Sequence, residues 1–145
     1  MSVTVQAHRV RSPVSLSALA RVGEVVLRAE RATAVGVSVT LVSAARIAQL
    51  NAVHLGVRGP TDVIAFALDG APGAGRLGDV YLAPSVARNQ ARRLRISVRE
   101  ELMRLVVHGI LHVLGHDHPD DTSRLSSPMW RRQEALLRRA MAARS

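Results

Sequence analysis

The 145-residue sequence contains no cysteine, no lysine and only three side chains of the Phe, Tyr and Trp types. Without cysteine, disulfides and thiolate-bound metals are excluded, so any metal must bind imidazole, carboxylate or water. Few aromatic side chains are available for nucleic-acid bases to stack on. The hydrophobic content of 48% consists mainly of Ala, Val and Leu, which predicts one folded domain over residues 1–145 with an aliphatic core.

Long apolar runs are also missing. No stretch approaches the roughly 18 residues of a membrane span, and the first ten residues lack the layout of a signal peptide. We therefore expect a cytoplasmic protein without membrane contact.

The charge is strongly one-sided, because all 20 basic residues are arginine and the net charge is +9. A bias toward GC-rich codons would explain the absence of lysine. A phosphate-containing partner is the functional explanation, since arginine pairs bidentately with phosphate. Nucleic acid is the partner that the charge favours.

Hydrophobic periodicity predicts alternating strands and helices followed by helices at the end of the chain. The expected fold is α+β (mixed α/β), with four strands and about five helices. Expected strands span 2–8, 35–42, 62–68 and 78–83, and expected helices span 12–31, 43–51, 84–95, 98–114 and 127–142. The first of these helices is placed by Ser12 as N-cap and Pro13 in the first turn.

Four of the six histidines lie within eleven residues of one another. Ser97 and Glu100 form a capping box that begins the helix on which His108 and His112 share one face. Gly115 ends that helix and turns the chain. His118 then returns to the same point from outside.

Three imidazoles with a vacancy for water are typical of a catalytic zinc site, with one Zn²⁺ per chain. The alternative is that these histidines bind no metal. Their spacing equals that of the metzincin peptidases, but Gly109 stands where those enzymes carry their general-base glutamate. The sequence therefore predicts a metzincin-like metal helix without the peptidase base.

Two residues inside the motif have open roles. Asp117 either orients a ligand imidazole from behind or caps the following turn with Pro119. His116 is expected in the wall of the cleft more than as a fourth ligand.

These residues resemble the YbeY-type family of bacterial rRNA-maturation endoribonucleases, whose mark is His-Gly-x-Leu-His followed by Gly-x-Asp-His. Further similar segments follow in the family's order over residues 35–140: Leu50-Asn51, Pro60 to Phe66, Leu77 to Val80, Gln90-Ala91, Met129 and Glu134.

The resemblance implies a small mixed sheet packed against helices and a zinc-dependent endoribonuclease specific for single-stranded RNA. It also implies a role in 16S rRNA 3′-end maturation and ribosome quality control, with rRNA and the ribosome or its proteins as partners. Asp62 and Asp79 would flank the metal cleft, or would only bind backbone near a turn. The family usually has Tyr-Arg after Leu-Asn, where this chain has His54-Leu55, and often Tyr at the position of His116.

In this reading zinc lowers the pKa of its bound water toward about 7 and polarises a phosphoryl oxygen. Arg58 is expected to take over the charge of the missing family arginine. Arg88, Arg92 and Arg93 would hold phosphates, unless they only form a solvated helix face. Two rival functions remain: a zinc-stabilised ribosome assembly factor that does not cut, and a metallopeptidase-like hydrolase.

Overall fold

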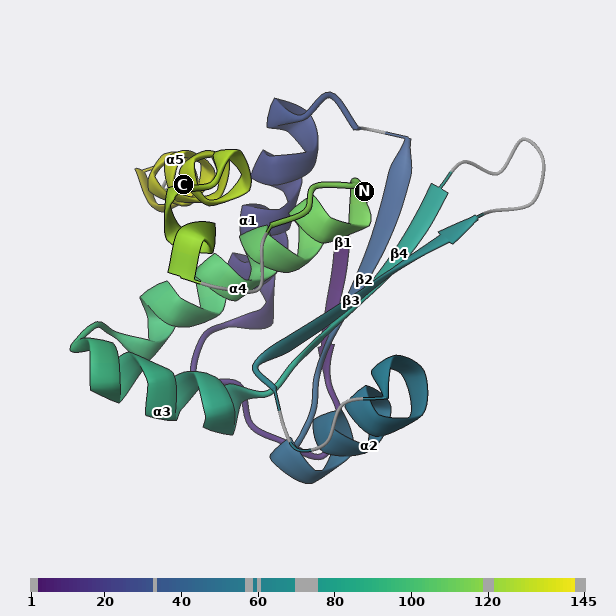
Figure 1. Ribbon diagram of the computed structural model, residues 1–145, viewed down its shortest axis with the longest axis vertical. Coiled ribbons are helices and arrows are strands. Elements are labelled where there is room, and N and C mark those ends of the chain that lie inside the picture. Colours follow the sequence, from purple (N-terminus) through teal and green to yellow (C-terminus); the bar gives the residue numbers. More distant parts are fainter. Residues whose placement is uncertain are drawn as a thin grey trace.

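The computed structural model describes residues 3–32, 34–56, 59, 61–69, 76–118 and 122–142. It contains one sheet with helices on both faces (Figure 1). The elements are β1 (Val3–Ala7), α1 (Leu16–Ala29), β2 (Val35–Leu41), α2 (Ala44–Leu55), β3 (Val63–Asp69), β4 (Arg76–Leu82), α3 (Pro84–Leu94), α4 (Val98–Val113), the 3₁₀ turn η1 (Thr122–Ser126) and α5 (Pro128–Ala142).

The four strands form a mixed sheet in the order β1-β2-β4-β3. β1, β2 and β4 are parallel, and β3 is an antiparallel edge strand. Val39 of β2 pairs with Val5 on one side and with Val80 on the other. The expected α+β fold with a four-stranded sheet and five α-helices is confirmed.

The main core lies between the sheet and the helices α1, α4 and α5. In β2 the side chains alternate, and every second one is buried against these helices. α4 runs through the middle of this layer and contacts β3, β4, α1, α3 and α5. α2 lies on the opposite face of the sheet, where a smaller cluster of apolar side chains holds it (Figure 1).

Close packing of α4 on the sheet depends on Gly109. A Cβ at this position would lie 2.6 Å from Cγ1 of Val80. Val80 is β-branched and fully buried, so it has little freedom to move away. The helix that carries the histidines is therefore pressed against β4 at the residue that follows His108.

The first helix begins three residues later than the sequence predicts. Ser15 is the N-cap, and its Oγ accepts a hydrogen bond from the backbone N of Ala18. Ser12 instead closes a local turn with the backbone of Val14. The prediction that Ser12 and Pro13 open the helix was wrong, because Ser12 is engaged before the helix starts.

The second helix begins as predicted at the N-cap Ser43 but runs to Leu55 instead of ending near Asn51. Gly56 ends it in the left-handed conformation with φ +67°, which glycine adopts without the penalty of a Cβ. None of the helices in the described ranges is long and apolar enough to cross a membrane.

Candidate metal centre

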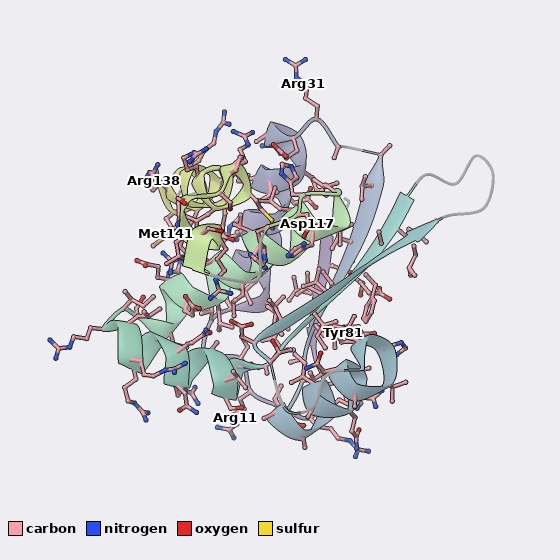
Figure 2. The ribbon with its side chains drawn as sticks, in the orientation of Figure 1. Arg11, Arg31, Tyr81, Asp117, Arg138 and Met141 are labelled. Carbon is pink, nitrogen blue, oxygen red and sulfur yellow. The ribbon has the colours of Figure 1, made fainter. Side chains whose placement is uncertain are left out.

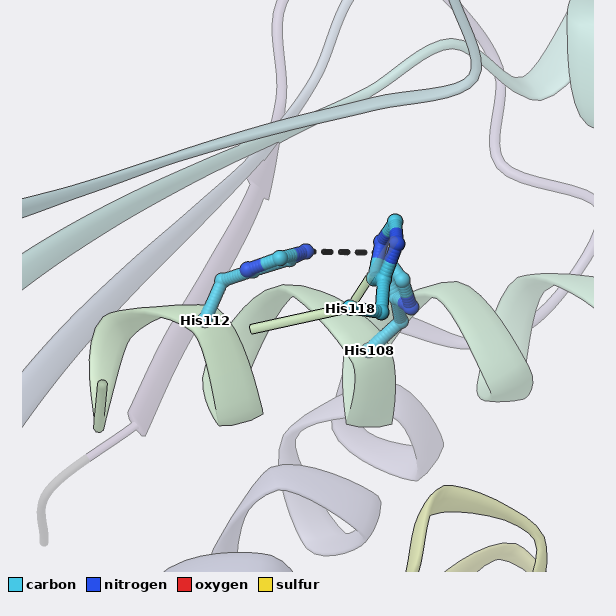
Figure 3. A group of neighbouring side chains, drawn as sticks. All are labelled: His108, His112 and His118. Atoms are coloured by element: carbon cyan, nitrogen blue, oxygen red, sulfur yellow. Dashed lines mark hydrogen bonds between the residues drawn. The ribbon is translucent and has the colours of Figure 1, made fainter. Parts of the chain in front are cut away.

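Three histidine side chains come together beside α4. Figure 3 shows their rings gathered on one side of the helix. The ring centroids of His108 and His112 are 4.6 Å apart, and that of His118 is 5.1 Å and 5.0 Å from theirs. One possible ligand atom from each ring lies within 4.8 Å of the other two. The structure thus brings together all three residues predicted as metal ligands.

The end of α4 sends the chain back toward the helix. Gly115 has φ +98°. Its backbone N donates to the carbonyl of His112, and the backbone N of His116 donates to that of Leu111 at 2.9 Å. These two bonds form a Schellman motif, which ends a helix at a left-handed glycine. The predicted role of Gly115 is confirmed, and this turn carries His118 to the other two rings.

The orientation of the two helical imidazoles follows from what their Nδ1 atoms contact. His108 Nδ1 lies 2.6 Å from Oε1 of Gln133, and His112 Nδ1 lies 3.0 Å from the carbonyl oxygen of His116. Both oxygens can only accept, so both Nδ1 atoms donate. The amide of Gln133 is itself oriented, because its Nε2 donates to Glu134.

Both imidazoles are held in the neutral form. Burial is the main reason that the pKa of His108 falls to about 4, and the positive charge of Arg124 contributes. Burial also lowers the pKa of His112. A neutral ring with its hydrogen on Nδ1 carries a lone pair on Nε2.

The two Nε2 atoms are 3.1 Å apart (dashed line in Figure 3), so two lone pairs meet. Two nitrogens bound tetrahedrally to one Zn²⁺ at 2.0–2.1 Å lie about 3.3 Å apart. A shared cation would convert the repulsion into two bonds. The residues present therefore fit a metal ion.

His116 and Asp117 support the turn. His116 Nε2 contacts Oε1 of Glu30 at 2.7 Å, while Arg132 binds the other oxygen of Glu30 at 2.8 Å. Burial would raise the pKa of Glu30, but its hydrogen bonds with Arg132 and His116 outweigh this and lower it. Asp117 accepts a hydrogen bond from the backbone N of His118. Both residues therefore hold the segment after α4, and the ring of His116 contacts Glu30 instead of joining the metal-binding group.

A cavity of about 670 Å³ adjoins the histidines, and His108 and His118 form part of its wall. Asp62 lines this cavity, as predicted from the resemblance. Asp79 does not, because its neighbours Gly78 and Val80 face α4 and successive side chains of a strand point to opposite faces. Figure 2 shows Tyr81, two residues further along β4, on the side of the sheet toward α2.

Arg104 lines the same cavity at the centre of three carboxylates. Its guanidinium lies 2.9–3.0 Å from oxygens of Glu100, Glu101 and Glu134. Burial raises the pKa of Glu101. For Glu134, burial would raise the pKa, but the hydrogen bond from Arg104 outweighs it and lowers it. The charge of Arg104 is therefore already matched within the protein.

The remaining predicted residues differ in where they lie. Arg58 lies outside the described residues. Arg88, Arg92 and Arg93 are exposed on α3, but only Arg93 of these lines the cavity. Figure 2 shows other arginines, such as Arg31 and Arg138, projecting outward at the periphery.

Gln133 and Glu30 were missed from the sequence. Gln133 has a detectable signal, since it is polar within the buried stripe of α5 that also contains Met129, Leu136 and Leu137. No local pattern in the sequence points to Glu30, because its partner His116 lies 86 residues further along the chain.

A mixed sheet covered by a helix with three converging imidazoles defines an α+β protein with a histidine site able to hold a metal ion. A family model described as Endoribonuclease YbeY matches residues 5–141. The chain belongs to this family.

Relatives named Endoribonuclease YbeY support the assignment. That of Micrococcus luteus is 45% identical over 60% of this chain and 60% of its own length. That of Thermobifida fusca is 41% identical over 75% and 77%, respectively. The solution structure of TM1509 from Thermotoga maritima is similar with a TM-score of 0.66 and 27% identity, over 97% of this chain and 89% of that one. The alignment thus spans about three fifths of the Micrococcus relative's length.

Proposed function

We propose that this protein is a single-domain, zinc-dependent endoribonuclease that cleaves single-stranded RNA. The observation that carries the proposal is the pair of Nε2 atoms 3.1 Å apart, a contact that a shared cation would stabilise, beside a cavity in a member of an endoribonuclease family. Zinc fits best, because three imidazoles and no thiolate make up the donor set.

Each histidine has a defined task in this function. His108, His112 and His118 hold the ion through one ring nitrogen each. When bound, the ion supplies Lewis acidity toward a phosphoryl oxygen and activates water. The hydrogen bonds on Nδ1 of His108 and His112 keep their Nε2 atoms directed at the ion and increase their basicity.

Cationic side chains bind the RNA backbone. Arg93 and Arg124 lie at the cavity, and Arg88 and Arg92 extend the basic surface along α3. Arg58 offsets charge that develops on the phosphate. The net charge of +9 supports binding to rRNA, and we propose 16S rRNA 3′-end maturation and ribosome quality control in the cytoplasm as the setting.

One observation favours a second function, a zinc-stabilised ribosome assembly factor that does not cut. Leu55, where the family usually has arginine, is 53% exposed at the end of α2 and carries no charge. A peptidase is disfavoured, because Gly109 supplies no base and lies against Val80.

The test compares the wild type with His112→Ala after metal analysis of both proteins. We expect one zinc per wild-type chain, cleavage of a labelled single-stranded RNA, and loss of both in the variant. Ribosome association should survive in the variant. If zinc-loaded wild type never cuts RNA, the nuclease proposal is wrong and the assembly-factor function is favoured. If the protein cleaves a panel of peptides faster than it cleaves RNA, the peptidase is favoured.

A further inference from the structure

The cavity beside the histidines has an apolar side that metal binding does not use. Leu94 at the end of α3 and Leu125 in η1 line it, yet they are 59% and 53% exposed. Trp130, the only tryptophan of the chain, lines it from α5. Exposed leucines are costly in water, and together with an indole they suit a flat apolar ligand.

Two arginines of the cavity wall have charges that no carboxylate in the described ranges neutralises. Arg93 and Arg124 are exposed, and neither forms an ion pair with any residue in the described part of the chain. Arg104, in contrast, binds three glutamates. The first two therefore remain available for anionic groups of a ligand, such as phosphates.

The polar part of the wall is rich in acceptors. Asp62 lines the cavity close enough to Glu101 for its charge to act on that carboxyl group. Gln90 also lines it, and its buried Oε1 has no hydrogen-bond partner within the described residues. A buried acceptor without a donor is costly, so a ligand that donates hydrogen bonds is favoured here.

We propose that this cavity is a subsite for one unpaired nucleobase of the RNA strand, and that it prefers cytosine to uracil. The base stacks on Trp130 between the two leucines, and its flanking phosphates bind Arg93 and Arg124. Cytosine donates from its exocyclic amino group to the acceptors, whereas uracil presents a carbonyl oxygen at that position. The volume of about 670 Å³ is in the range of small-molecule sites.

This inference rests on the proposed function, since the strand that supplies the base is the substrate of the adjoining metal site. The cavity wall includes His108 and His118, so a nucleotide bound in the cavity would lie beside the scissile phosphate at the metal site. The subsite would thereby select single-stranded RNA, because a base paired in a duplex cannot enter.

The single tryptophan makes the test direct. The full chain, with zinc and separately with EDTA, is titrated with hexacytidylate and hexauridylate while the tryptophan fluorescence is recorded. We expect saturable quenching and tighter binding of the cytidine oligomer. A cytidine hexamer with central abasic sites should quench less.

Binding of fluorescein-labelled oligomers to variants separates stacking from charge. Trp130→Leu should weaken binding about 5- to 100-fold, and Trp130→Phe should restore most of it. Arg93→Gln and Arg124→Gln should each reduce the salt dependence by about one phosphate contact. Arg139→Gln, an exposed arginine of α5 outside the cavity wall, is the matched control and should change neither.

Asp62→Asn should reduce the preference for cytosine over uracil. Equal affinity for both oligomers, or unchanged tryptophan fluorescence, would overturn the subsite even if the strand is still cut at the metal. Quenching by apolar peptides but not by RNA would overturn it in favour of a peptide site. Quenching with the expected preference, but without cleavage of longer strands, would support the subsite and contradict the nuclease function.

Discussion

The metal site has two halves that are held in different ways. His108 and His112 lie in a helix that is packed against the sheet, and buried or turn-forming oxygens fix their Nδ1 atoms. His118 lies in the segment after the helix, which is held by Asp117 within the turn and by Glu30, the C-cap of α1. The helical half is preorganised by packing, and the other half depends on a few polar contacts.

The largest difference between the halves is expected when a ligand is removed. His108→Ala and His118→Ala should each reduce zinc affinity by more than about 100-fold, because loss of a group that only orients a ligating histidine already reaches that range. Only His108→Ala also leaves Oε1 of Gln133 buried without its donor, which should cost about 1–3 kcal/mol of unfolding free energy in the metal-free protein. Calorimetric zinc titration and urea unfolding measure the two effects. Equal losses of stability would contradict the comparison.

A second variant tests the support of the helical half. Gln133 is 1% exposed, and Gln133→Leu would remove the acceptor that orients His108 while filling its buried place with an apolar side chain of similar size. Zinc affinity should fall about 10- to 100-fold, and the visible spectrum of the Co²⁺-loaded protein should change. Gln49→Leu, at an exposed position of α2, is the control that should alter neither. An unchanged spectrum would mean that the helix alone orients the ring.

The support of the other half should matter less. Glu30→Gln keeps an amide oxygen that can still accept from His116 but removes the charge that binds Arg132. We expect zinc affinity to fall about tenfold or less, measured by competition with a chelating dye. Glu24→Gln, in the α1 helix that Glu30 caps, should have no effect on affinity. A larger loss than for Gln133→Leu would reverse the ranking of the two halves.

The network behind Gln133 should affect stability instead of zinc affinity. Glu134→Gln should cost about 1–3 kcal/mol of unfolding free energy at pH 7, since it weakens a charged hydrogen bond to Arg104. Because the hydrogen bond from Arg104 lowers the folded-state pKa of Glu134 despite burial, its contribution is present above about pH 4.5 and is lost as the pH falls through that lowered pKa. The difference in unfolding free energy between the wild type and Glu134→Gln should therefore become smaller at acid pH. A pH-independent difference in urea unfolding would contradict this assignment.

The sequence predicts the helical half of the site better than the rest. The spacing of four residues, the N-cap Ser97 and the glycine at position 115 are local signals, and the structure agrees with these three, whereas only half of the capping box forms. The Ser97 Oγ accepts from Glu100 as expected, although the carboxylate of Glu100 binds Arg104. Local sequence signals are sufficient to predict how His108 and His112 are placed, because the helix itself sets the geometry of residues four apart.

Long-range contacts and strand faces were harder to predict. Nothing near Glu30 indicates that it will meet His116, and Asp79 was assigned to the cleft without knowing which face of β4 packs on α4. A shift of one residue in a strand exchanges the two faces. The contact of Gly78 with Val113 decides which face of β4 packs on α4, and that contact exists only in the folded protein.

The contact between Glu30 and His116 also bears on the order of folding. It joins residues 86 positions apart, and such pairings carry a large loop-closure cost and form late unless other contacts precede them. The first two ligands can assemble as soon as their helix forms. Docking of the amino-terminal third of the molecule would then strengthen ion binding in a late step of folding, by no more than the factor of about ten expected for Glu30→Gln.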